Sequence, residues 1–388
     1  MCALYVDKHR PRSLDKLDYH PELTAQLKNL ASGSEVPHLL FHGPSGAGKK
    51  TRITALLRAL FGPGVEKMRL EHKEFTVGAA KKKVMLTTVA SNYHIEMNPS
   101  DLGNNDKDVV SQVIKEIAQY HPLATGGLGQ PAAGMGAGAA GADGGEGSAK
   151  AKTFKVVVIM EADRLSRQAQ AALRRTMEKY SGSCRLVLCA NSPTRVIEPV
   201  RSRCLAVRVS APTDAEVEGV LQAVCRKEQL TLPPAFGAKV AKHAERNLRR
   251  ALLLLEACRV AQYPFKPEQP VAVADWEQYV GGIAKDVLAE QTPACLLKVR
   301  GKLYELLTNC IPADVIIKAL EKALSKNLDD TVRHAMAQAA AHYEHRLCQG
   351  RKDIYHLEGF VAKFMACYKQ FVCEQSQLMA GMDFDDFE

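Results

Sequence analysis

The sequence predicts a three-layer α/β domain with a parallel sheet, followed by two helical domains. Short apolar runs such as PHLLFH (37–42) alternate with segments of helical spacing as far as about residue 209. The run Val156 to Met160 is apolar without a break, as in a central strand covered on both faces. From about residue 211 onward only helical patterns follow, punctuated by proline. We therefore place the domains at 1–209, about 210–268 and about 269–388.

The first elements surround a glycine-rich loop. PHLLFH ends at Gly43 and is expected to be a buried strand, and KTRITALLRALFG has helical spacing and stops at Gly62. KVMLTTVASNYHIEMNPSD predicts one or two strands with a turn at Asn98-Pro99. NDKDVVSQVIKEIAQY has helical spacing after an Asn/Asp start. The glycine-rich loop is thus expected between a buried strand and a helix.

The next elements repeat the strand and helix alternation. FKVVVIMEADRL contains the apolar strand, and SRQAQAALRRTMEKYSG predicts a helix ending near Gly182. CRLVLCANSP and RCLAVRVS predict two more strands. Strands that alternate with helices indicate a parallel sheet with right-handed crossovers.

Residues 124–149 differ in composition from the rest of the chain. Ten glycines and eight alanines leave little apolar surface to bury, so this segment is expected to be a disordered loop inserted within the first domain.

Composition limits the classes of function. The formal net charge of +9 fits an anionic partner such as nucleic acid, and equally a solvated basic surface. The sequence predicts neither a transmembrane helix nor a secretory signal. The lysines at 81–83 are interpreted either as a nuclear import patch or as exposed charge. The 11 cysteines lack zinc-site spacing and are expected to be mostly buried thiols.

GPSGAGKKT (43–51) predicts a phosphate-binding loop. Its cradle consists of Gly43, Pro44, Ser45, Gly46, Ala47, Gly48 and Lys49. Backbone N–H groups of such a loop and the following helix N-terminus favour a phosphate, and Lys49 is expected to meet the β- and γ-phosphates. The alternative is a chance glycine turn, which the flanking strand and helix disfavour. Lys50 stands where the motif needs a Mg²⁺-binding hydroxyl; Thr51 follows one place late and is expected to meet the α-phosphate.

VVVIMEAD predicts the second part of the same site. In P-loop ATPases a strand of this kind ends in Asp-Glu, where Asp holds Mg²⁺ and Glu orients the attacking water. Here Met160 occupies the Asp position and Glu161 follows. The alternative is an ordinary core strand with Met160 as filler. We expect a site that binds ATP or ADP, holds no Mg²⁺ efficiently and hydrolyses weakly or not at all.

Six segments together resemble a known family. They are YVDKHRPRSLD, HLLFHGPSGAGKKT, EADRL, ALRRTMEKYS, LCANSPTRVIEPVRSRC and NLRRALLLLEA. They are similar to replication factor C small subunits, which are sliding-clamp loaders of the AAA+ class. The resemblance is closest to the eukaryotic small subunit with Gly-Lys-Lys-Thr in its loop. It implies an AAA+ domain, a helical lid domain and an all-α collar domain.

The resemblance also implies residue roles. Val6, Arg10 and Pro11 match the N-terminal segment that lies against the adenine. Asn191 matches the sensor near the γ-phosphate, and Arg249 matches the lid arginine that reaches the nucleotide. Arg203 matches the arginine finger that acts on a neighbouring subunit. The resemblance also implies contact with the DNA backbone at helix N-termini, for which Lys107, Arg164 and Arg167 are the candidates. Surface salt bridges and solvated charges are the alternatives for these basic residues.

The resemblance implies a subunit of a hetero-pentamer in the nucleus. Its partners are the other replication factor C subunits, the sliding clamp PCNA and primer–template DNA bound without sequence preference; no membrane partner is expected. Two other hypotheses are a self-sufficient AAA+ ATPase of the chaperone or remodeller type, and a structural scaffold with an empty site. Intact metal ligands favour the first, and absence of nucleotide favours the second.

Overall fold

The computed structural model describes residues 4–33, 35–77, 82–99, 106–119 and 154–380. It divides into two compact units, Met1–Val271 and Ala272–Glu388. The predicted insertion at 124–149 lies outside the described residues, and so does Lys81; Lys82 begins a strand. The predicted boundaries near 209 and 268 stay predictions. Among the described residues, no helix is both long and apolar enough to cross a membrane.

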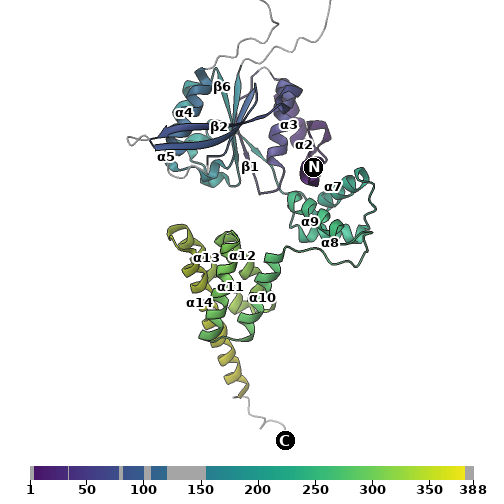
Figure 1. Cartoon of the computed structure of the whole chain (residues 1–388), viewed down its shortest axis with the longest axis vertical. Helices are drawn as coiled ribbons and strands as arrows, with labels where there is room; N and C mark the ends of the chain where they lie inside the picture. Colours follow the sequence, from purple (N-terminus) through teal and green to yellow (C-terminus); the bar gives the residue numbers. More distant parts are fainter. Residues whose placement is uncertain (1–3, 34, 78–81, 100–105, 120–153, 381–388) are drawn as a thin grey trace, which may run out of the picture. The chain divides into compact units, whose positions relative to one another are not determined.

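A seven-stranded sheet forms the centre of the first unit, in the order β2-β3-β4-β5-β6-β1-β7 (Figure 1). The strands are β1 His38–His42, β2 Arg69–Val77, β3 Lys82–Ala90, β4 His94–Met97, β5 Lys155–Ile159, β6 Cys184–Ala190 and β7 Cys204–Arg208. The five strands from β4 to β7 in this order pair in parallel. Their carboxyl ends therefore meet at one edge of the sheet, where ligands of such sheets bind.

The predicted parallel sheet is confirmed for these five strands, and β2 and β3 extend it as antiparallel strands. β2 pairs antiparallel with β3, and β3 pairs antiparallel with β4. Only residues 91–93 separate β3 from β4, whereas a parallel crossover needs about a dozen residues. β2 was missed because it is an edge strand with few apolar residues, and its Leu70 is exposed.

Helices cover both faces of the sheet and make three layers. α2 (Pro21–Ser32) and α3 (Lys49–Phe61) pack on one face, and α4 (Asp106–Gln119) and α5 (Arg167–Lys179) on the other (Figure 1). The unbroken apolar run of β5 is explained by its two buried faces. Val156 and Val158 belong to the core on the side of α2 and α3, and Val157 and Ile159 belong to the core on the side of α4 and α5. A strand buried on both faces needs apolar residues at every position.

A helical segment follows the sheet in the first unit. It consists of α7 (Asp214–Lys227), α8 (Pro234–His243) and α9 (Leu248–Ala261); the short α6 (Glu198–Arg201) lies earlier in the chain, between β6 and β7. A capping box between Thr213 and Glu216 begins α7. The N-terminal α1 (Tyr5–Lys8) contacts this segment, because the Tyr5 backbone N–H donates to Glu256 Oε2 at 3.1 Å. Single 3₁₀ turns lie at 14–16, 63–66, 162–164, 193–195 and 325–327.

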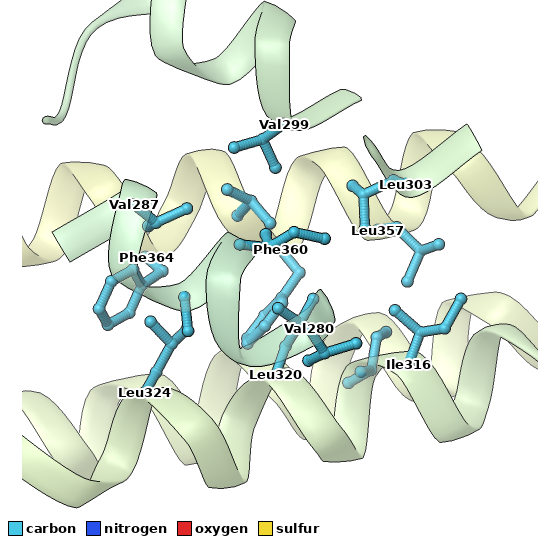
Figure 2. Packing of buried hydrophobic residues seen from close by; sticks show 14 of the residues in the cluster. Val280, Val287, Val299, Leu303, Ile316, Leu320, Leu324, Leu357, Phe360 and Phe364 are labelled. Atoms are coloured by element: carbon cyan, nitrogen blue, oxygen red, sulfur yellow. The ribbon is translucent and has the colours of Figure 1, made fainter. Parts of the chain in front are cut away.

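The second unit contains five described helices around one apolar core. They are α10 (Asp275–Ala289), α11 (Pro293–Thr308), α12 (Ala313–Leu324), α13 (Asp330–Gln349) and α14 (Asp353–Ala380). Figure 2 shows Val280, Leu303, Leu320 and Phe360 from four of these helices pointing into the shared core. Each fully buried side chain of this kind contributes about 1.5–3 kcal/mol relative to an exposed one.

Candidate nucleotide site

One pocket in the first unit brings together most of the predicted nucleotide-binding residues. Its lining includes Val6, Arg10, Pro11, Ser45, Gly46, Gly48, Lys49, Lys50, Thr51, Glu161, Asn191 and Arg249. The glycine loop after β1, residues 160–161 after β5 and Asn191 after β6 all lie at the carboxyl edge of the sheet. Gly43, Pro44 and Ala47 belong to the same loop without lining the pocket. Most of the predicted residues thus lie around one pocket, and their roles stay predictions.

Glycines let the loop approach its neighbours closely. Gly46 and Gly48 have φ of +76° and +79°, which side chains rarely adopt. A Cβ at Gly46 would lie 1.8 Å from Asn247 Oδ1, and one at Gly48 would lie 2.1 Å from the Tyr19 hydroxyl oxygen. Only glycine fits at both positions, so a backbone cradle forms in front of α3.

Lys49 lies in the pocket as a buried ammonium group. It is 8% exposed and donates hydrogen bonds to the carbonyl oxygens of Gly43 (2.6 Å) and Pro44 (2.9 Å) and to Asn191 Oδ1 (2.8 Å). These three acceptors are neutral. Burial lowers the pKa of Lys49; Cys189 and the Asp163 carboxylate oppose this shift, and the nearby cation of Arg249 adds to it. An anion in the pocket relieves the effects of burial and of Arg249.

Charge in the pocket favours an anionic ligand. Five of the lining residues are lysine or arginine (Arg10, Lys49, Lys50, Lys227 and Arg249), against two carboxylates, Asp18 and Glu161. The N-terminal dipole of α3 adds partial positive charge at the loop. A polyphosphate matches this balance.

The other part of the lining is apolar. The N-terminal segment supplies Val6, Pro11 and Leu17, α7 supplies Val220, Ala223 and Val224, and α9 supplies Leu248 and Leu252. A flat apolar base is the kind of group that such a surface buries. Together the charged cradle and the apolar lining match a nucleotide.

Lys50 makes an ion pair that the sequence did not reveal. Its Nζ lies 2.7 Å from Oε2 of Glu96, whose side chain is 7% exposed on β4. The hydroxyl that binds Mg²⁺ in active P-loops is therefore replaced by an ammonium paired with a buried carboxylate. Nothing in the spacing of residues 50 and 96 signals this contact.

The end of β5 offers one carboxylate to the pocket. Met160 and Glu161 both line it, and Glu161 has a left-handed φ of +51°. The Arg164 Nε lies 3.4 Å from Glu161 Oε2. Beside them, burial raises the pKa of the Cys189 thiol to about 11, so the thiol stays protonated.

The available donors fit Mg²⁺ poorly. Mg²⁺ prefers oxygen ligands in octahedral geometry, and positions 50 and 160 provide an ammonium and a thioether. Over the residues that the structure describes, no group of three or more His, Cys, Asp or Glu is placed to hold a metal. The phosphate cradle is thus present, while two ligand positions of its usual metal are not.

Sequence reasoning missed several other residues of the site. His9, Asp18, Tyr19, Cys189, Lys227 and the apolar residues of α7 line the pocket. The helical spacing of Val220 and Val224 predicts one apolar face, but not what that face covers. For Tyr19 the sequence offers no signal.

Arg203 lies outside the lining of this pocket. It follows α6, and its guanidinium contacts Glu178 Oε1 through Nε at 2.8 Å and Nη2 at 2.5 Å. Its Nη1 also donates to the Pro199 carbonyl oxygen at 2.8 Å. In this single chain Arg203 thus forms a surface salt bridge. Its role as an arginine finger for a neighbouring subunit stays a prediction.

Lys107 and Arg167 lie at two linked helix N-termini. They are exposed in the first turns of α4 and α5. Asp106 accepts hydrogen bonds from the Ser166 backbone N–H (2.6 Å) and hydroxyl (2.8 Å), which joins the two helix starts. Arg164 is exposed in the turn before α5. This surface combines basic side chains with helix N-termini, which both favour phosphate.

Comparison with known proteins adds independent findings. Residues 276–372 match the model "Replication factor C subunit 3, C-terminal domain", 219–260 match "RCF1/5-like, AAA+ ATPase lid domain", and 146–213 match "DNA polymerase III, delta subunit". The chain is 51% identical to replication factor C subunit 3 of Homo sapiens, over 95% of this chain and 97% of the relative. It is 47% identical to replication factor C subunit 3 of Arabidopsis thaliana, over 95% of this chain and 98% of the relative. A solved structure of the Thermotoga maritima RuvB Holliday junction branch migration motor matches with a TM-score of 0.49 and 14% identity, over 82% of this chain and 90% of that one.

Proposed function

The chain belongs to the replication factor C subunit 3 family, and from this premise we propose that it is one small subunit of a pentameric clamp loader. In this proposal it works with the other replication factor C subunits to place the sliding clamp PCNA on primer–template DNA in the nucleus. Identity over nearly the full length of the relatives supports the assignment. A self-sufficient AAA+ remodeller is less well supported, because positions 50 and 160 lack metal ligands.

The observation that carries the nucleotide part of the proposal is Lys49 in the glycine cradle. Its buried ammonium, with three neutral acceptors, faces a pocket with an excess of cations. In the bound state Lys49 holds the β- and γ-phosphates, Asn191 positions that ammonium, and Arg249 contacts the phosphates from α9. Val6, Arg10 and Pro11 enclose the adenine together with the apolar residues of α7.

Hydrolysis in this site is proposed to be weak or absent. Phosphoryl transfer depends on cations that neutralise the charge developing between the β- and γ-phosphates, a role that Mg²⁺ fills when it is bound. Glu161 remains to orient a water molecule, but positions 50 and 160 do not complete a metal site. Binding, in contrast, depends mainly on the loop backbone and Lys49. We infer that the nucleotide serves chiefly as a structural ligand.

Two other surfaces are proposed to act outside this pocket. Arg203 is proposed to reach the ATP site of a neighbouring subunit, because its guanidinium is 30% exposed and does not line its own pocket. Lys107, Arg164 and Arg167 are proposed to contact DNA phosphates. Contacts of this kind hold the backbone and carry no sequence information.

The test combines nucleotide analysis with titration. Full-length chain is purified, denatured, and the released nucleotide is identified by chromatography; calorimetry then measures ADP and ATP affinity. Wild type is expected to bind, and Lys49→Ala to bind at least about tenfold more weakly, since a charged hydrogen bond contributes about 1.5–3 kcal/mol. Lys242→Ala, an exposed lysine of α8, is the matched control. Absence of binding in wild type would favour an empty scaffold.

Assembly is tested separately. The chain is co-expressed with the other replication factor C subunits, and the complex is purified through a tag on this chain. A stoichiometric hetero-pentamer with clamp-stimulated ATPase supports the proposal. Recovery of this chain as an active ATPase on its own would support the remodeller instead.

A further inference from the structure

The ion pair between Lys50 and Glu96 gives the pocket a fixed cation. The two atoms Nζ and Oε2 lie 2.7 Å apart, Glu96 is buried on β4, and Lys50 is the second residue of α3. A buried carboxylate is costly unless it is paired, so Glu96 holds the ammonium at a defined place. Lys50 lines the pocket and its side chain is 41% exposed, so the ion pair does not enclose the ammonium.

The position of Lys50 is unfavourable for a lysine in the free helix. A cation in the first turn lies at the positive end of the helix dipole. Glu96 offsets part of this repulsion, and an anion in the pocket offsets more. A polar uncharged residue avoids the repulsion altogether, so helix stability does not explain the lysine. The ion pair with Glu96 accounts for a cation at this position, and the pocket gives that cation an anionic ligand to bind.

The ammonium also occupies the sequence position from which a P-loop hydroxyl holds Mg²⁺. An ammonium group carries three donors, and the ion pair with Glu96 uses one of them. The remaining donors suit phosphate oxygens in the way that metal-bound water does. Met160, at the other ligand position, supplies a thioether in the pocket, which is a poor ligand for Mg²⁺.

We propose that this site binds adenine nucleotide without Mg²⁺, with the ammonium of Lys50, positioned by Glu96, in place of the metal. The inference rests on the proposed function only in that the pocket holds a nucleotide. A lysine fixed to the protein carries one positive charge, half that of a divalent metal ion, so it neutralises less of the charge that develops during hydrolysis. The arrangement therefore favours retention of nucleotide over its hydrolysis.

The first experiment measures ADP affinity of the full chain by calorimetry, once in excess Mg²⁺ and once in excess EDTA. Wild type is expected to give dissociation constants within about twofold of each other. The variant K50T/M160D regains both ligand types and is expected to bind about tenfold more tightly in Mg²⁺ than in EDTA. Mn²⁺ retained with ADP, followed by electron paramagnetic resonance, is expected for that variant and not for wild type.

The second experiment tests Glu96 as a positioning residue. E96Q keeps the shape but removes the charge that fixes Lys50, and it is expected to weaken ADP binding about threefold to tenfold in both buffers. E344Q is the matched control, because it also removes the carboxylate of a lysine ion pair, Lys318 with Glu344 at 2.8 Å, in the second unit. It is expected to leave affinity unchanged. Circular dichroism and melting temperature establish that each variant is folded.

The outcomes separate the two proposals. If wild type binds ADP but loses tenfold or more of its affinity in EDTA, the metal-free inference is overturned while the proposed nucleotide site stands. If E96Q binds as wild type does in both buffers, Glu96 does not position the cation and the inference fails in that part. If wild type binds no ADP in either buffer, both proposals fail together.

Discussion

The hydroxyl of Tyr19 donates a hydrogen bond to the Ala47 carbonyl oxygen at 2.8 Å, in the middle of the glycine loop. The ring of Tyr19 lies 4.7 Å from the guanidinium of Arg52, which is fully buried and donates to the Tyr19 carbonyl oxygen at 2.7 Å. Burial raises the pKa of Tyr19, so its hydroxyl stays a donor at neutral pH. A segment that precedes the first strand thus holds the shape of the phosphate loop.

Tyr19→Phe removes this hydrogen bond and keeps the ring against Arg52. We expect a loss of about 1 kcal/mol in the free energy of unfolding, measured by urea denaturation, because a buried carbonyl loses its partner. Nucleotide affinity is expected to fall about threefold as the loop loosens. Tyr263→Phe, at a half-exposed ring beside Phe265, is the control. If Tyr19→Phe binds nucleotide as tightly as Tyr263→Phe does, Tyr19 has no part in shaping the loop.

Gly48 and Gly62 provide a matched pair for backbone and steric effects. Their φ values are +79° and +80°, yet a Cβ at Gly48 meets the Tyr19 hydroxyl oxygen at 2.1 Å, while nothing lies within 4 Å of one at Gly62. Alanine costs about 1 kcal/mol or more at either positive φ, and Gly62, with ψ of −170°, has the conformation that is more strictly confined to glycine. Only Gly48→Ala also displaces Tyr19. Calorimetry is expected to show at least about a tenfold loss of nucleotide affinity for Gly48→Ala and less than twofold for Gly62→Ala.

A double variant makes this prediction sharper. Tyr19→Phe removes the atom that the new Cβ meets, so Tyr19→Phe/Gly48→Ala is expected to bind better than the two single effects predict. Coupling between contacting residues commonly amounts to about 0.5–3 kcal/mol. Strict additivity would mean that the clash is not the cause of the loss.

The sequence predicted those parts of the site that are consecutive in the chain. The glycine loop, Lys49 and the end of β5 follow a local pattern of strand, loop and helix. Tyr19 and Glu96 contribute through contacts that exist only once α3 packs on the sheet and β4 pairs with β5. Their neighbours in the sequence carry no motif. Likewise, β5 was predictable from its unbroken apolar run, whereas the mostly polar edge strand β2 was not.

His38 is expected to make stability depend on pH. Its Nδ1 accepts a hydrogen bond from the Leu186 backbone N–H at 3.0 Å, so this nitrogen is unprotonated in the folded chain. Burial lowers the pKa of His38 below its ordinary value of 6.5. As pH falls, the unfolded chain therefore takes up a proton first. The free energy of unfolding is expected to fall once pH drops below about 6.5, down to the lower pKa of the folded state.

His38→Asn isolates this effect, because an amide oxygen accepts the same hydrogen bond at every pH. Urea denaturation between about pH 7 and pH 5 is expected to give a smaller loss of stability for the variant than for wild type. His334→Asn removes an exposed histidine of α13 and serves as the control. Equal slopes for wild type and His38→Asn would exclude His38 as a source of the dependence.

Arg203→Ala is expected to damage catalysis in a neighbouring subunit and to spare nucleotide binding in this chain. In the single chain Arg203 pairs with Glu178 at the surface, and such a pair contributes only about 0–1 kcal/mol. Releasing the guanidinium toward a partner therefore costs little. An arginine finger supplied in trans contributes about 10³–10⁵ in rate, because it meets charge that develops only in the transition state.

The assembled complex with Arg203→Ala is expected to lose the share of clamp-stimulated ATPase that one site provides. Affinity of the isolated chain for nucleotide should stay within about threefold, a difference of less than about 0.7 kcal/mol, because Arg203 does not line the pocket. Arg201→Ala, an exposed arginine two positions earlier, controls for lost surface charge. If the isolated Arg203→Ala chain loses nucleotide while the complex turns over normally, Arg203 acts within its own subunit and the assignment in trans is wrong.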